Sequence, residues 1–109
     1  MTLGRALYNA AMELNERQKK HLRRLGHALH PLIQLGNAGL TDAVAAEMDR
    51  ALTDHELVKA RARVGDREVR DAALQGLAQK TRSLLVQRIG NVGLFYRRHA
   101  TLTRIVLPD

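Results

Sequence analysis

The sequence predicts an α/β fold with a four-stranded mixed sheet, about three helices and the element order α-β-α-β-α-β-β. Three observations predict it. Amphipathic helical segments alternate with short strand-like segments along the chain. Each strand–helix–strand unit prefers a right-handed parallel crossover, and a glycine-rich turn joins the last two strands into an antiparallel hairpin. At 109 residues, the chain is long enough for one domain with one modest core.

The N-terminal part divides into an extension and a first helix. Residues 1–14 are expected to form a loosely ordered extension, because their weak helical spacing has no cap, and residues 15–109 to form the folded domain. The first helix is expected over residues 16–29. Asn15 is a good N-cap, and Gln18 stands three residues later, as in a capping box. The proline that follows disfavours helical backbone at the residue before it and ends the helix.

A glycine loop connects the first strand with the second helix. The strand is expected over residues 32–35, and the loop runs from Gly36 to Gly39. Thr41 is the expected N-cap of a helix that ends near Thr53. Unpaired backbone N–H groups and the positive end of the helix dipole lie at a helix N-terminus, so this loop is a candidate phosphate-binding site. The alternative is an ordinary strand-to-helix turn without a ligand.

The second strand, expected over residues 57–64, has a basic face. Apolar side chains alternate with Lys59, Arg61 and Arg63. Side chains two residues apart on one strand face are about 6.7 Å apart, close to the roughly 7 Å between successive phosphates of an extended nucleic-acid strand. The alternative is an exposed sheet surface whose charges discourage aggregation.

The last third of the chain supplies a helix and a hairpin. The third helix is expected over residues 67–82, with Asp66 as its N-cap. The other expected elements are strands over residues 84–89 and 94–97, a four-residue connection over 90–93, and a last extended segment over 103–107. The side chains of the third helix that are expected to face the core are Val69, Ala72, Ala73, Leu77 and Thr81.

Positive charge dominates the composition, with 18 lysine and arginine residues against 11 acidic ones and a formal net charge of +7. This balance favours nucleic acid as the partner, with an anionic membrane surface second. Basic residues are concentrated in the first helix and after residue 80, where a solvated surface would usually mix the signs. The further candidates for contacts with a polyanion are Arg17, Lys20, Arg23, Arg24 and Arg97. A solvated helix surface is the alternative for the first four.

Several classes of function are not indicated. The chain has no cysteine, so disulfides and thiolate metal sites are excluded and a reducing, cytoplasmic compartment is expected. No apolar run approaches the roughly 20 residues of a membrane-spanning helix, so a soluble protein is expected. No membrane is expected among its partners. The chain has one serine and no carboxylate pair beside an apolar pocket, which argues against catalysis. It has no GxxxxGK[ST] or GxGxxG motif, so neither a cofactor nor a small-molecule substrate is expected. His27 and His30 are poorly placed to chelate a metal, because the helix breaks there.

Several segments of the chain resemble one known family when they are taken together. They are LNERQKKHLRRLGHALHP, IQLGNAGLT, ALTDHELVK, DRE, VQRIG, LFYRR and IVLP, in this order from Leu14 to Pro108. The set resembles the YhbY family, stand-alone bacterial proteins made of one CRM (chloroplast RNA splicing and ribosome maturation) domain. The resemblance implies a fold similar to the C-terminal domain of bacterial translation initiation factor three. It also implies RNA binding and a role in ribosome assembly on precursors of the large subunit.

The family's GxxG loop corresponds to Gly36, Asn37, Ala38 and Gly39. This loop contains no lysine or arginine, so its positive charge must come from neighbouring elements. The resulting hypothesis is a non-catalytic, monomeric protein that binds precursor large-subunit ribosomal RNA in a pre-ribosomal particle. Because aromatic residues are scarce, binding should depend on phosphates and RNA shape rather than on base stacking. A DNA-binding architectural protein and a module that docks an acidic protein remain the alternatives.

Overall fold

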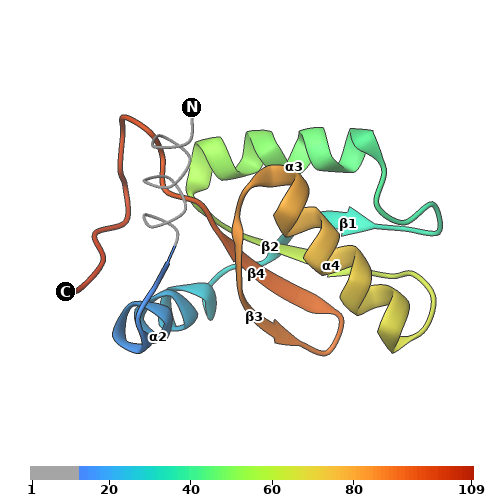
Figure 1. Cartoon of the computed structure of the whole chain (residues 1–109), viewed down its shortest axis with the longest axis horizontal. Coiled ribbons are helices and arrows are strands. Elements are labelled where there is room, and N and C mark those ends of the chain that lie inside the picture. Colours follow the sequence, from blue (N-terminus) through green and yellow to red (C-terminus); the bar gives the residue numbers. More distant parts are fainter. Residues whose placement is uncertain (1–12) are drawn as a thin grey trace.

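A computed structural model describes residues 13–109 and confirms the predicted fold class (Figure 1). The predicted extension lies outside the described residues except for Glu13 and Leu14. The elements are α2 (Glu16–Gly26), β1 (Pro31–Leu35), α3 (Asp42–His55), β2 (Leu57–Ala62), α4 (Arg67–Thr81), β3 (Leu84–Ile89) and β4 (Val92–Tyr96). Within residues 13–109, no helix has both the length and the apolar character that crossing a membrane would require.

The four strands form one mixed sheet in the order β1-β2-β4-β3. Strands β1 and β2 are parallel, as expected for the crossover through α3. Strand β4 lies antiparallel between β2 and β3. The crossover through α4 therefore leads from β2 to β3, which is not its neighbour, and β4 of the closing hairpin lies between these two strands.

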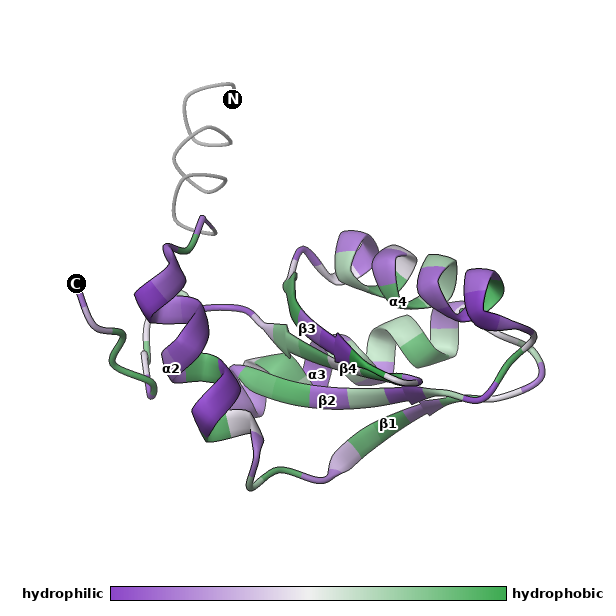
Figure 2. Ribbon diagram, turned by 90° about the horizontal axis from the view of Figure 1, so that it is seen from below, coloured by the Kyte–Doolittle hydropathy of each residue, from purple (hydrophilic) through white to green (hydrophobic). Residues whose placement is uncertain are grey.

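The helices cover the two faces of the sheet unequally (Figure 2). Helices α3 and α4 pack on one face, over the larger cluster of buried side chains, which includes Met48, Leu74 and Phe95. Helix α2 packs on the other face through a smaller cluster of Leu22, Leu57, Leu94 and Tyr96. Because one helix cannot cover four strands, part of this second face is left open.

The three predicted N-caps are confirmed. Asn15 forms the full capping box: its side chain accepts from the Gln18 N–H at 2.8 Å, and the Gln18 side chain accepts from the Asn15 N–H at 3.0 Å. Thr41 and Asp66 accept from the N–H groups three residues later, at 3.1 and 3.0 Å respectively. Each cap depends on side chains within one helical turn, which is why the sequence alone locates these helix starts.

The first helix ends at Gly26, three residues before the predicted end at Leu29. A Cβ atom on Gly26 would lie only 2.8 Å from Leu94, so glycine permits the close approach of α2 to the sheet. Beyond it, the chain tightens into a turn in which the Leu29 N–H donates to the Gly26 carbonyl at 3.0 Å. The chain then enters β1 directly at Pro31.

Several predicted boundaries in the second half are wrong. Strand β2 ends at Ala62 rather than at residue 64, and α4 ends at Thr81, because Arg82 adopts a left-handed conformation. Strand β4 spans residues 92–96 instead of 94–97, because Ile89 pairs with Val92 across a two-residue turn rather than the expected four-residue connection. Residues 103–107 form no strand.

The predicted core face of the third helix is also partly wrong. Thr81 and Leu77 are buried as expected, but Leu74 and Ala78 are buried in place of Val69 and Ala72. Val69 is 46% exposed and sits against the turn before the helix, where a Cβ on Gly65 would touch it at 2.8 Å.

A buried carboxylate holds the C-terminal segment on the domain. Glu56, which links α3 to β2, is fully buried. One of its oxygens accepts from the His99 N–H at 2.7 Å, and the other accepts from Arg104 and Ile105 at 2.7 and 2.8 Å. Ile105 and Leu107 pack against the cluster beneath α2. The Gln18 side chain of α2 donates to the Pro108 carbonyl at 3.0 Å, so this segment braces α2.

Candidate nucleic-acid interface

The part of the sheet that α2 leaves uncovered forms a shallow, cation-rich surface. We call it the open sheet face and define it by Lys59 and Arg61 of β2, Gln87 and Ile89 of β3, and Val92 of β4. Together with the end of α2, these residues line a hollow of about 320 Å³. No carboxylate lines this hollow.

Helix α2 forms one wall of the open sheet face. His27, just past its end, lines the hollow. Arg23 and Lys20 precede His27 by four and seven residues, so helical periodicity places them on the same flank. Arg17 and Arg24 lie farther round the helix and are exposed. Within residues 13–109, none of these four basic side chains forms an ion pair, whereas Lys19 approaches Glu16 at 3.8 Å.

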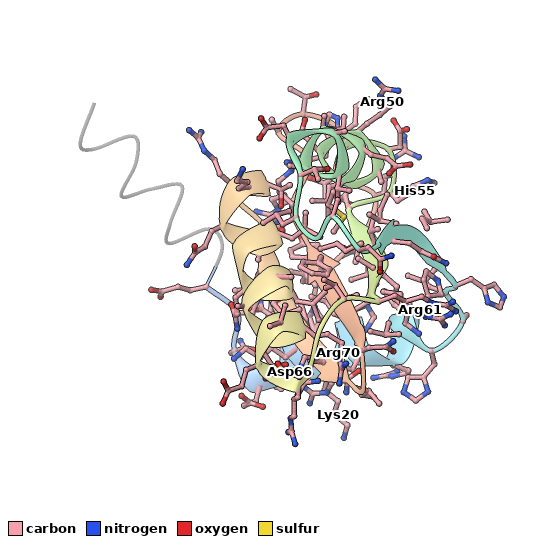
Figure 3. All side chains as sticks on the ribbon, turned by 90° about the vertical axis from the view of Figure 1, so that its right-hand side faces the viewer. Lys20, Arg50, His55, Arg61, Asp66 and Arg70 are labelled. Carbon is pink, nitrogen blue, oxygen red and sulfur yellow. The ribbon has the colours of Figure 1, made fainter. Side chains whose placement is uncertain are left out.

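Lys59, Arg61 and Arg63 lead along β2 towards the glycine loop. Strand alternation puts Lys59 and Arg61 on the face that carries α2, because Ala60 and Ala62 point into the core on the other side. Figure 3 shows Arg61 on the side of the sheet away from α4. The strand ends before Arg63, but the Arg63 N–H donates to the Leu35 carbonyl at 2.8 Å. This bond places Arg63 beside the residue from which the loop begins.

The loop is exposed and its backbone is accessible. Gly36, Asn37 and Ala38 are exposed, and the Gly39 N–H donates to the Gly36 carbonyl at 2.8 Å, which closes a tight turn. Gly39 has φ +71, a conformation that glycine adopts readily. A Cβ at either glycine would meet nothing within 4 Å. In the described part of the chain, the N–H groups of Asn37 and Ala38 have no acceptor.

The N-terminal tip of α3, just behind the loop, already has partners of its own. The Thr41 hydroxyl already accepts from the Val44 N–H, and the exposed Asp42 carboxylate stands in the first turn of α3. Lys80 approaches Asp42 at 3.2 Å and balances its charge. A phosphate would therefore meet the free N–H groups of Asn37 and Ala38 before the tip of α3, because a carboxylate already occupies the positive end of the dipole.

Arg97 is a predicted site residue that the structure places away from this surface. Its side chain is only 16% exposed, and one terminal nitrogen contacts the Asp49 carboxylate at 2.6 Å and the Thr81 carbonyl at 2.8 Å. The other nitrogen donates to the Asp49 carbonyl at 3.0 Å and to the Thr53 hydroxyl at 2.9 Å. Arg97 thus joins the end of β4 to α3 and α4, and its charge is already paired.

Replacing Arg97 with alanine is therefore expected to lower the free energy of unfolding by about 2 kcal/mol, because several charge-assisted hydrogen bonds are lost together. Urea denaturation followed by circular dichroism measures the change. The matched control is Arg50→Ala, because Arg50 lies exposed on α3 without an ion pair among residues 13–109. Equal stability of the two variants would show that the Arg97 contacts do not stabilise the fold.

Known proteins resemble this chain in sequence and in fold. The sequence model of the CRS1 / YhbY (CRM) domain family matches residues 14–97 of this chain. The chain belongs to this family. "Probable RNA-binding protein PA4753" of Pseudomonas aeruginosa is 43% identical over 88 residues, which cover 81% of this chain and 85% of that protein. "Probable RNA-binding protein YqeI" of Bacillus subtilis is 33% identical over 95 residues, covering 87% of this CRM protein and 99% of the relative.

The fold of this CRM protein is also found in a solved structure. The solution structure of the hypothetical protein SAV1595 from Staphylococcus aureus matches with a TM-score of 0.75 and 31% sequence identity, covering 88% of this chain and all of that one. The relatives are named as RNA-binding proteins rather than enzymes, in agreement with the non-catalytic function that the sequence predicts. Among residues 13–109, no group of three metal-ligating side chains lies close enough together to hold an ion.

Proposed function

We propose that this CRM protein binds RNA through the open sheet face, the adjoining flank of α2 and the loop over residues 36–39. The observation that carries the proposal is the convergence of basic side chains without ion pairs on one side of the sheet, around a hollow that no carboxylate lines. Such a surface attracts a polyanion, because each phosphate contact releases counterions. The names of the relatives support RNA as that polyanion.

The arrangement supports a path for the sugar–phosphate backbone. Lys59, Arg61 and Arg63 would contact successive phosphates, and the flank of α2 would supply Lys20 and Arg23 from the side. At the end of this row, the N–H groups of Asn37 and Ala38 would bind a phosphate directly, because the glycines leave room for close approach. Phe95 and Tyr96 are fully buried and take no part in stacking.

The proposed target is precursor large-subunit ribosomal RNA, and the proposed role is assistance in ribosome assembly by a cytoplasmic monomer. The resemblance to the YhbY family supports this finer assignment. Crosslinking in cells followed by sequencing of the attached RNA tests it. Enrichment of precursor large-subunit RNA is the expected result, whereas crosslinks spread evenly over messenger RNAs would contradict it. Competition between structured RNA and duplex DNA separates RNA binding from DNA binding.

The double substitution Gly36→Asp and Gly39→Asp is expected to weaken RNA binding about tenfold relative to a Gly36→Asn and Gly39→Asn control. The two variants have side chains of the same size, and both residue types tolerate the positive φ of residue 39 better than most. They differ only in the two negative charges placed where the phosphate is proposed to bind. Filter binding measures the ratio, and circular dichroism checks the fold.

The asparagine control separates electrostatic repulsion from a change in loop shape. Equal affinities of the aspartate and asparagine variants would remove the loop from the interface. Substitution of the basic residues of β2 would then be the remaining test of the interface.

A further inference from the structure

The hollow on the open sheet face is apolar at its centre and polar at its rim. Val92 and Leu94 of β4 form its floor, and Ile89, which is 67% exposed, extends the floor at the edge strand. Gly26 and His27 close one side. Its volume of about 320 Å³ falls at the small end of the pockets that bind small organic molecules.

Strand register arranges this lining in two rows that cross the sheet. Lys59 lies opposite Leu94, and Leu94 lies opposite Gln87, so the first row reads cation, apolar, amide. The second row is formed by Arg61, Val92 and Ile89 and reads cation, apolar, apolar. Each row spans two inter-strand spacings, about 10 Å. This is comparable to the reach of a nucleotide from its phosphate to the far edge of its base.

The chemistry of the rows matches the phosphate of one nucleotide, the flat face of its base and the hydrogen-bonding edge of that base. The phosphate would pair with the cations of β2, and the flat face of the base would cover the apolar side chains of β4 and β3. The Gln87 amide carries both donors and an acceptor, as the hydrogen-bonding edge of a base requires. A base in a continuous helix has both faces stacked, so only an unpaired nucleotide could enter the hollow.

We propose that this hollow binds the base of one unpaired nucleotide of the RNA. The proposal rests on the proposed function, because the phosphate row of β2 delivers the nucleotide to the hollow. It adds a preference for RNA in which a bulged or looped nucleotide interrupts a helix. An acidic protein segment fits less well, because it would leave the apolar floor uncovered while binding the cations.

Three RNA hairpins test the proposal: one fully paired, one with a single bulged nucleotide, and one whose bulged nucleotide lacks its base. The protein is expected to bind the bulged hairpin about tenfold more tightly than either of the others. Equal affinity for the bulged and abasic hairpins would overturn the base-binding proposal. If all three nevertheless bind with a strong salt dependence, the proposed RNA-binding function stands. If none binds, that function fails as well.

A pair of matched variants tests whether the preference for the bulged hairpin depends on the hollow. Ile89→Asp places a charge on the exposed part of the floor, and Val106→Asp makes the same type of change on the C-terminal segment, where Val106 is 82% exposed. The two proteins have the same net charge, and both substituted side chains are solvent-accessible in the fold. Ile89→Asp is expected to abolish the preference for the bulged hairpin, and Val106→Asp to retain it. Retention of the preference in both variants would exclude the hollow as the base site.

Discussion

Replacing Glu56 with glutamine is expected to lower the free energy of unfolding by about 3 kcal/mol, because a fully buried carboxylate loses charge-assisted hydrogen bonds. Three backbone N–H groups share its two oxygens. In glutamine, one of these oxygens becomes an NH₂ group, which would face at least one N–H donor and leave it unsatisfied. Urea denaturation measures the loss, and the control is Glu47→Gln, which replaces an exposed glutamate on the preceding helix α3.

The effect should depend on pH in a defined direction. Burial by itself raises the pKa of Glu56, but hydrogen bonds from the N–H groups of His99, Ile105 and Arg104 and the charge of His99 outweigh it and hold the pKa below its ordinary value of 4.5. A carboxyl with a lowered folded-state pKa stabilises the fold above its unfolded-state pKa, and this contribution disappears as the pH falls through the folded value. The stability gap between wild type and Glu56→Gln should therefore be full at neutral pH and shrink below about 4.5.

The Glu56 substitution should also affect α2 more than α4. The C-terminal segment packs Ile105 and Leu107 beneath α2 and accepts a hydrogen bond from Gln18. Hydrogen exchange should therefore report a larger loss of protection in α2. A stability gap that is constant with pH, or equal losses of protection in α2 and α4, would contradict the role assigned to this carboxylate.

The contacts of Glu56 illustrate what the sequence could not reveal. Its partners lie 43 to 49 residues away along the chain, and no local pattern distinguishes it from an ordinary surface acid at the end of a helix. Asn15, Thr41 and Asp66 could be identified because a cap is satisfied within one turn. The order of the elements could be predicted for the same reason, since hydrophobic periodicity and turn residues are local signals.

A bulge explains why the hollow was not predicted. Between Leu85 and Gln87, strand β3 gains one residue against β4, so the alternation of its side chains shifts. Leu85 contributes to the core under α3 and α4, and strict alternation would put Gln87 and Ile89 on that same buried face. The extra residue turns both towards the hollow instead. Sequence patterning alone cannot detect this shift, because Val86 fits either face.

The sequence shows the charges of the candidate interface but not their positions in space. The sequence predicts basic residues at helical and strand spacing, but it does not show that the flank of α2 adjoins the face of β2 on which Lys59 and Arg61 lie. It also does not separate Arg97 from Arg61. Both are arginines of predicted strands, yet Arg97 meets Asp49 of α3, whereas no carboxylate approaches Arg61 among residues 13–109.

The double substitution Lys59→Gln and Arg61→Gln is expected to weaken RNA binding roughly 10- to 100-fold at physiological salt, because two phosphate contacts are lost from the centre of the interface. The slope of log affinity against log salt should become shallower by about 1.5, since each contact accounts for about 0.7 to 0.9. Both side chains are partly exposed and lack ion pairs in the described part of the chain, so the fold should tolerate the change.

The matched control removes the same number of charges from the opposite side. This control is the double substitution Arg50→Gln and Arg67→Gln. Arg50 lies on α3 and Arg67 on α4, and these two helices cover the other face of the sheet. Figure 3 shows Arg50 well away from Arg61. A general effect of net charge would lower affinity and slope equally in the two double variants, because the long-range field depends on total charge. A local interface predicts that the slope changes only when the β2 residues are replaced, so equal slopes would reject the open sheet face as the RNA-binding surface.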